Sequence, residues 1–264
     1  MIDFDQIEGW SPQLKKALSA SVTDLTLSSI RRANPSYVED ARDLLFTLAG
    51  RDDVIEATLA WLRSSTIAGY HGTRLTDDEV RCVRKKGLLP LDASARKARL
   101  VRALSQHSSW KTVAQRLDAV LKEHGPNNRA GRREGQAHLT LSRAGLVNSF
   151  NHYLTHGSEF DQHAAHALLG DDGVTLLARD GKGRVIQFAV PGQEALNASH
   201  PRFSVADLRA PGDVPNIASQ FLKAWSYQVA YPDFNPRTLA VDCGMVFRSA
   251  IPAAWITNIE TLAD

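Results

Sequence analysis

The sequence predicts an α+β protein in which a helical region comes first and a mixed β-sheet follows. Apolar residues recur at helical spacing through the first 65 residues, whereas stretches typical of strands begin at Thr66 and become frequent beyond Gly170. Hydrophobic residues make up 43% of the 264-residue chain and charged residues 23%, as in ordinary globular proteins. We therefore expect a helical N-terminal region over 1–65 and a second domain over 66–264.

The first region is expected to contain three helices. Ser11 and Pro12 are typical of a helix start, with an N-cap residue followed by proline in the first turn. A second helix is expected from Pro35 to Gly50, because its apolar residues share one face and glycine commonly ends a helix. A third is expected over 52–62. This region has no evident cluster of catalytic residue types, and we interpret it as a helical cap or adaptor.

The second region is expected to open with a strand that carries His71. The capping box formed by Thr76 and Glu79 then predicts a helix that ends at Gly87. The further expected elements, in chain order, are helices over 93–107 and 110–124, a basic loop over 125–135, a strand over 137–141, a helix over 146–156, a β-hairpin with strands over 174–178 and 185–190, a helix over 217–229 and a last strand over 239–249.

Charge, cysteine content and hydropathy exclude several classes of protein. The formal net charge of +2 argues against a dedicated nucleic-acid coat or a membrane-surface protein. Cys82 and Cys243 are isolated, which excludes a cysteine-built zinc site and a disulfide framework. The acidic start of the sequence leads us to expect no signal peptide, and no apolar segment approaches the length needed to span a bilayer, so export would need a route that reads no cleavable leader. A cytoplasmic protein without a membrane partner is expected.

Tyr70 to Arg74, with the sequence YHGTR, is the first candidate site. Gly72 has no Cβ, so a ligand can approach the backbone closely. His71 and Thr73 point to the same side of an extended segment, where both could face one ligand. The alternative interpretation is a surface turn whose histidine caps a neighbouring strand, because a four-residue match is short.

A second stretch, residues 136–159, adds further groups. A strand ends at Ser142 and Arg143, and the helix that follows carries Tyr153 as a flat stacking surface. Together with the histidine-glycine-threonine order and the sequence GLLP at 87–90, this arrangement resembles the ADP-ribosyltransferase fold. It is closest to the branch of diphtheria-toxin-like and poly-ADP-ribose-polymerase-like enzymes, which have a His-Tyr-Glu triad.

The resemblance covers roughly residues 66–260 and implies a split mixed β-sheet that clasps NAD as substrate. It implies that Gly72 holds the nicotinamide, that Tyr153 stacks on it, and that His71 holds a ribose. A glutamate would stabilise the positive charge that develops on the other ribose as the glycosidic bond breaks. The other residues expected to bind NAD are Tyr70, Thr73, Arg74, Ser142 and Arg143.

The glutamate of that family lies on a late strand, which here contains Asp242 and no glutamate. Glu159 and Glu134 are the nearest alternatives. We expect Glu159 to be the catalytic carboxylate because it lies within two helical turns of Tyr153. Without a placed carboxylate, the domain would bind NAD or ADP-ribose without transferring it.

A metal-dependent hydrolase is a second hypothesis. Five residues at spacings of 4, 3, 4 and 3 would line one stripe of an unbroken helix, and their side chains suit zinc or another transition metal. These residues are His152, His156, Glu159, His163 and His166. The sequence Gly157-Ser158 interrupts the segment, so a polar histidine-rich face is the alternative, and no metal is named.

The sequence thus predicts an NAD-dependent ADP-ribosyltransferase that releases nicotinamide and modifies a macromolecular acceptor. With water as the acceptor, the same site would make an NAD glycohydrolase. The acceptor is not identified as protein or nucleic acid, although the basic residues over 129–133 could steer an acidic one.

Overall fold

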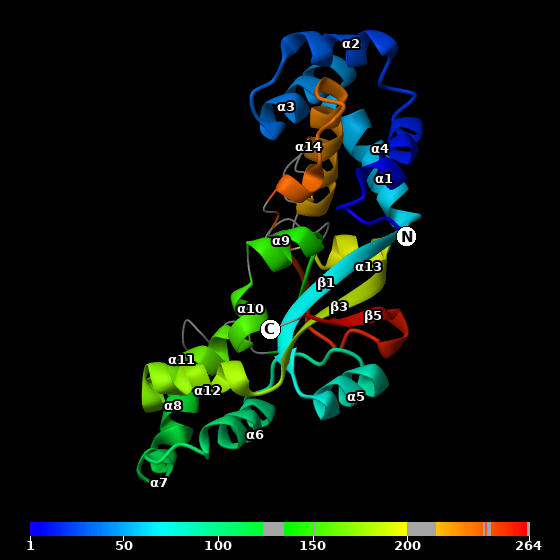
Figure 1. Ribbon diagram of the computed structural model, residues 1–264. Helices are drawn as coiled ribbons and strands as arrows, with labels where there is room; N and C mark the ends of the chain where they lie inside the picture. The colour runs from blue at the N-terminus through cyan, green and yellow to red at the C-terminus, as the bar shows by residue number, and fades with distance from the viewer. Residues whose placement is uncertain (124–134, 150, 200–214, 240, 242–243, 263–264) are drawn as a thin grey trace. The chain divides into compact units, whose positions relative to one another are not determined.

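A computed structural model describes residues 1–123, 135–149, 151–199, 215–239, 241 and 244–262 of the chain (Figure 1). The protein combines many helices with one β-sheet and so belongs to the α+β class that the sequence predicts. The chain forms two compact units, each built from separate segments. Unit 1 comprises residues 1–70, 139–146 and 188–246, and unit 2 comprises residues 71–138, 147–187 and 247–264.

Within the described residues, five strands form the sheet in the order β4-β2-β1-β3-β5. Their bounds are β1 Thr66–Leu75, β2 Ala137–Thr140, β3 Lys182–Pro191, β4 Gly244–Phe247 and β5 Ile256–Thr261. The central strand β1 pairs antiparallel with β2, with Tyr70 opposite Thr140. From Ile67 to Leu75, β1 is buried at every residue except His71, which is partly exposed.

Unit 1 is built around an aromatic core. Its main helices are α1 (Ile7–Ala17), α2 (Asp24–Ala33), α3 (Val38–Ala49), α4 (Arg51–Arg63), α13 (Gly192–Asn197) and α14 (Asn216–Ala230). The rings of Phe4, Trp10, Trp61 and Phe221 contact one another, with centroids 4.9 to 6.2 Å apart. Since Phe221 belongs to α14, this core joins the N-terminal helices to a helix near the end of the chain.

The compact units therefore divide the chain differently from the boundary expected between residues 65 and 66. The buried face of α14, which includes Phe221 and Leu222, packs against α2, α3 and α4. The backbone of α13 also approaches α4 closely, because a Cβ at Gly192 would lie 1.7 Å from the carbonyl oxygen of Leu62. The helical N-terminal region thus forms one unit with segments from the second half of the chain.

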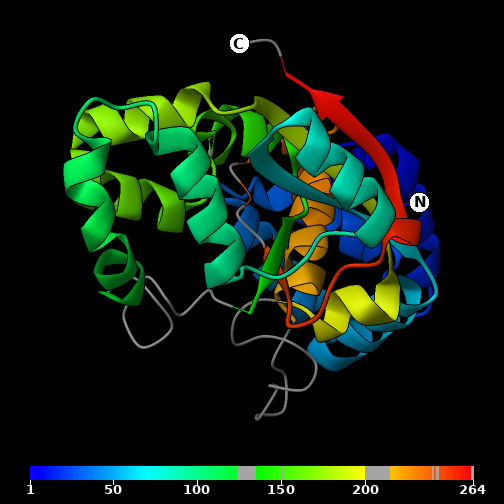
Figure 2. The same ribbon diagram turned by 90° about the horizontal axis from the view of Figure 1, so that it is seen from below.

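Unit 2 contains a second group of helices. They are α5 (Asp77–Lys86), α6 (Ala93–Leu104), α7 (Trp110–Val113), α8 (Leu117–Glu123), α10 (His152–His156), α11 (Glu159–Leu169) and α12 (Asp171–Arg179). Figures 1 and 2 show α6, α8, α11 and α12 lying together, and these helices pack against one another.

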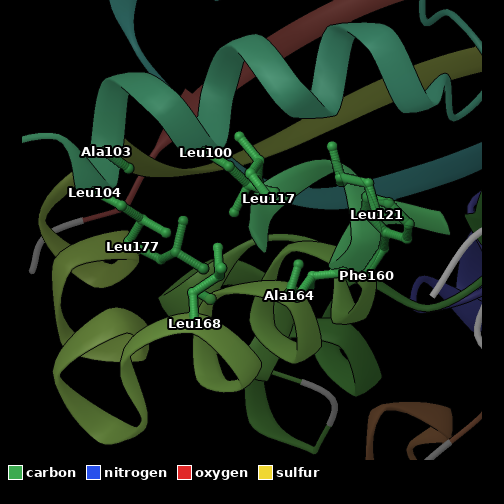
Figure 3. Packing of buried hydrophobic residues seen from close by; sticks show 11 residues of the cluster. Leu100, Ala103, Leu104, Leu117, Leu121, Phe160, Ala164, Leu168 and Leu177 are labelled. Carbon is green, nitrogen blue, oxygen red and sulfur yellow. The ribbon is translucent and has the colours of Figure 1, made fainter. Parts of the chain in front are cut away.

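The apolar core of this group consists of buried side chains from four helices (Figure 3). They are Leu100, Ala103 and Leu104 of α6, Leu117, Val120 and Leu121 of α8, Phe160, Ala164, Ala165 and Leu168 of α11, and Leu177 of α12. Within each of α6, α8 and α11, these residues recur at helical spacings of three and four, which places them on one face. The packing of α6 against α11 also brings together the charged residues Arg96 and Arg99 of α6 and Asp161 of α11, which belong to the candidate site.

The prediction of a β-hairpin over 174–190 is wrong for its first strand, because residues 171–179 form α12. Gly173 and Leu177 are its buried residues, and their spacing of four is that of a helix. A Cβ at Gly173 would lie only 2.3 Å from the carbonyl oxygen of Ala165, so glycine lets α12 pack directly on α11. Packing therefore overrides the strand preference of the segment.

Several other expected elements differ from the structure. Ser11 and Pro12 lie inside α1 and not at its start, and the helix expected over 110–124 is divided into α7, a 3₁₀ helix over Ala114–Arg116 and α8. The helix expected over 146–156 is divided into α9 (Arg143–Asn148) and α10. Among the described residues of the last expected strand, Gly244–Phe247 form β4, whereas Arg248 and Ser249 lie beyond it; Asp242 lies outside the described residues. By contrast, the capping box of Thr76 and Glu79 is present at the start of α5.

No helix in the described ranges combines the length and the hydropathy required to cross a bilayer.

Replacing Leu100 by alanine should destabilise unit 2, because Leu100 is fully buried in the core shown in Figure 3. Loss of a buried leucine side chain costs about 2–5 kcal/mol of unfolding free energy. The neighbouring Val101→Ala is the control, since Val101 is 38% exposed and its loss should cost less than about 0.5 kcal/mol. Urea denaturation measures both, and equal losses would contradict this account of the core.

Candidate active site

Between Ile67 and Leu75 of β1, His71 is the residue that is partly exposed. Its Nδ1 lies 2.8 Å from the backbone carbonyl oxygen of His138, on the neighbouring strand β2. The pKa of His71 is lowered to about 4, mainly by burial and to a smaller extent by the positive charge of Arg96, against the opposing effect of the bond to His138. The imidazole is therefore neutral at neutral pH.

The hydrogen bond to His138 also selects the tautomer of His71. A carbonyl oxygen only accepts hydrogen bonds, so Nδ1 of the neutral ring carries the proton and donates it. The other nitrogen, Nε2, is then a hydrogen-bond acceptor. His71 can thus accept a hydrogen bond from a ligand hydroxyl, such as that of a ribose.

The residues after His71 bring the end of β1 next to α10. Gly72, Thr73 and Arg74 are buried, and Nη1 of Arg74 lies 3.4 Å from the carbonyl oxygen of Leu154 in α10. Burial lowers the pKa of His156, also in α10, and the charge of Arg74 lowers it further. The structure therefore brings the first expected motif next to the helix that carries Tyr153.

A sharp turn places Tyr153 beside Glu159. α10 ends at Gly157, whose φ of +84° favours glycine, and Ser158 then caps α11 by accepting a hydrogen bond from the backbone N–H of Asp161. The hydroxyl of Tyr153 donates to Oε1 of Glu159 over 3.0 Å. The phenol and the carboxylate that the sequence analysis paired are thus in direct contact.

His152 is a further member of this group. Its Nε2 lies 3.5 Å from the same Glu159 oxygen, and its ring centroid lies 3.9 Å from that of Tyr153. The sequence analysis placed His152 only in a metal-binding stripe. In the sequence, only the position of His152 next to Tyr153 indicated that it could lie beside Glu159.

Asp161, Arg96 and Arg99 form a charged cluster that the sequence analysis missed. Asp161 is fully buried, and its Oδ2 lies 2.9 Å from Nη1 of Arg96 and 3.5 Å from Nε of Arg99. Both arginines belong to α6. These residues are more than 60 positions apart, so nothing in the sequence indicated their contact. Only Ser158-x-x-Asp161, which has the spacing of a helix cap, pointed to a structural position for Asp161.

Three residues expected to bind NAD lie in unit 1, whereas the other six site residues lie in unit 2. Tyr70 is buried and donates a hydrogen bond to Asp3 over 2.9 Å, and its burial raises its pKa. The hydroxyl of Ser142 donates to Asp5 over 2.6 Å and accepts from the backbone N–H of Gly145. The third is Arg143, at the start of α9, whose charge opposes the raised pKa of Tyr70.

The proposed metal-binding stripe is not continuous. The five residues are divided between α10 and α11 by the turn at Gly157, so they do not share the face of one helix. In the described part of the chain, no three histidine, cysteine, aspartate or glutamate side chains are grouped so that they could hold a metal ion.

Comparison with known protein families, with curated proteins and with solved structures finds no match for this chain. Functional assignment therefore depends on the residues and geometry described above.

The titration of His71 tests the environment at the end of β1. We expect a midpoint near pH 4 in long-range ¹H–¹⁵N NMR spectra, against about 6.5 for an unperturbed imidazole. Between these values, the unfolded chain binds a proton that the folded protein does not, so His71 makes folding less stable as the pH falls from 6.5 to 4. A His71→Gln variant should lose less stability than the wild type over this pH window. A titration midpoint near pH 6.5 for His71 in the wild type would contradict the effect of burial.

Proposed function

We propose that the protein is an NAD-dependent ADP-ribosyltransferase that releases nicotinamide and transfers ADP-ribose to a macromolecular acceptor. The observation that carries this proposal is the contact between Tyr153 and Glu159, 3.0 Å apart. The neutral, partly exposed imidazole of His71 on β1 supports it. Within this proposal, the sheet, in which β1 and β2 run antiparallel rather than in the mixed arrangement expected, would correspond to the split sheet of the ADP-ribosyltransferase-like enzymes, and β1 would be the strand that faces NAD.

The proposed reaction breaks the bond between C1′ of the ribose and the nicotinamide nitrogen. The electron pair of that bond leaves with nicotinamide, which loses its positive charge, and positive charge develops on the ribose. A carboxylate beside this ribose stabilises the oxocarbenium-like transition state. The acceptor then forms the new bond to C1′ and gives up a proton.

Each side chain has a separate role in this scheme. Glu159 supplies the carboxylate, and Tyr153 orients it through the hydroxyl while its ring offers a surface on which nicotinamide can stack. His71 would accept a hydrogen bond from a hydroxyl of the adenine-side ribose through Nε2. NAD is a substrate in this scheme, and the enzyme would act in the cytoplasm.

The acceptor is the open part of the proposal. A protein or a nucleic acid is the proposed acceptor, and with water in its place the protein would be an NAD glycohydrolase. The basic residues 129–133, which could steer an acidic acceptor, lie outside the described residues.

Glu159→Gln should abolish most nicotinamide release, because the amide keeps the shape of the side chain but removes the negative charge. We expect kcat to fall by roughly 10²–10³-fold, as for the loss of one electrostatic contact to a transition state, with NAD affinity largely kept. Chromatographic measurement of free nicotinamide gives the rate. The control is Glu56→Gln, an exposed glutamate on α4 of unit 1.

If the wild-type protein binds NAD and releases no nicotinamide, it is a non-catalytic NAD- or ADP-ribose-binding module. If Glu159→Gln releases nicotinamide as fast as the wild type, Glu159 is not the catalytic carboxylate.

His71→Ala should abolish NAD turnover and leave the protein folded. The substitution removes one hydrogen bond to His138, which contributes about 1 kcal/mol to stability. Circular dichroism checks the fold, and the nicotinamide assay measures turnover. Unchanged turnover in a folded His71→Ala protein would show that His71 takes no part in the reaction.

A further inference from the structure

The buried carboxylate of Asp161 is held by two arginines from one helix. Arg96 Nη1 donates to Oδ2 of Asp161 over 2.9 Å, and Arg99 Nε lies 3.5 Å from the same oxygen. Asp161 and Arg99 are both almost completely buried. A buried charge without a partner is costly, so each of these groups restricts where the others can lie.

The turn that leads to Glu159 lies directly beside this cluster and is held by hydrogen bonds of Asp161 and Gln162. The backbone N–H of Asp161 donates to Ser158 Oγ over 3.1 Å, and the side chain of Gln162 donates to the carbonyl oxygen of Gly157 over 3.0 Å. A Cβ at Gly157 would lie 3.1 Å from Arg99 Nη2, so glycine lets the guanidinium lie against this turn. Glu159 lies between Ser158 and Asp161 and is therefore anchored on both sides.

Apolar packing keeps the two helices of the cluster in register. Figure 3 shows Leu100, Ala103 and Leu104 of α6 in the same core as Phe160 and Ala164 of α11. Arg96 precedes Leu100 by one helical turn, and Asp161 precedes Ala164 by nearly one turn. The ion pair therefore lies at the end of this apolar contact, next to the turn that carries Glu159.

We propose that Arg96 is a positioning residue, which acts through Asp161 to hold the Glu159 carboxylate in hydrogen-bond contact with Tyr153. This inference rests on the proposed function as far as catalysis is concerned. Arg96 also acts on the other half of the site, because its positive charge disfavours protonation of His71. A single arginine of α6 thus influences both the carboxylate and the imidazole.

Arg96 is a better residue to replace than Asp161. Removal of the Asp161 charge leaves two arginines without their shared partner, a loss large enough to prevent folding. The side chain of Arg96 is 24% exposed, and Arg99 still contacts Asp161 when Arg96 is replaced. The control is Arg102→Gln, because Arg102 lies on the same helix and pairs with Glu79 and Asp180, at 3.0 and 2.8 Å, rather than with Asp161.

The experiment compares Arg96→Gln, Arg96→Lys and Arg102→Gln with the wild type. In nicotinamide release, Arg96→Gln should lower kcat by roughly 10- to 100-fold, as expected for a misplaced catalytic group, with little change in KM. Arg96→Lys should recover most of kcat, since one charged contact to Asp161 can be rebuilt by an ammonium group. Arg102→Gln should keep the kcat of the wild type.

NMR provides readouts that do not depend on turnover. Arg96→Gln should shift the backbone amide signals of Gly157, Ser158 and Glu159 and raise the pKa of His71, because a nearby positive charge is removed. Arg96→Lys and Arg102→Gln should leave the pKa of His71 close to that of the wild type.

Equal losses of kcat in Arg96→Gln and Arg102→Gln would overturn the inference, because they would indicate a general structural effect. Unchanged amide signals at residues 157–159 in Arg96→Gln would also overturn it. A wild type that releases no nicotinamide would contradict the proposed function. If in that case Arg96→Gln, and neither of the other two variants, shifts these amide signals and the pKa of His71, the positioning of the turn by Arg96 is still supported.

Discussion

The ion pair between Arg96 and the fully buried carboxylate of Asp161 is the interaction on which the candidate site depends. Because a buried charge must stay close to its partner, this contact ties α6 to the first turn of α11. Glu159 begins that turn, so the position of the carboxylate depends on the packing of two helices rather than on a loop. The apolar core of Figure 3 gives that packing its rigidity.

His71 and Glu159, the two groups of the candidate site, differ in charge. His71 is held neutral on a buried strand and presents an acceptor nitrogen. Glu159 is a partly exposed carboxylate that contacts the hydroxyl of Tyr153. In the proposed reaction, the neutral imidazole would bind a sugar hydroxyl and the carboxylate would oppose the positive charge that develops as the glycosidic bond breaks. This division of labour supports the proposed chemistry.

Local sequence signals predicted some helix boundaries and missed others, and they did not predict the tertiary contacts. The capping box of Thr76 and Glu79 predicted α5, because hydrogen bonds within one turn determine it. The segment 174–178 was mistaken for a strand, because its close packing on α11 through Gly173 cannot be read from nearby residues. The proximity of Tyr153 and Glu159 followed from short spacing, whereas the contact of Asp161 with Arg96 joins distant segments and gave no signal.

The most direct test of the account is an NAD titration followed by NMR at His71 and Tyr153 in one sample. If both groups contact one bound NAD, the Nε2 signal of His71 and the ring signals of Tyr153 should shift together, with the same dissociation constant. The Nδ1 signal should change little, because that nitrogen already donates to His138. Saturation with NAD that leaves either residue unaffected would contradict a shared dinucleotide site.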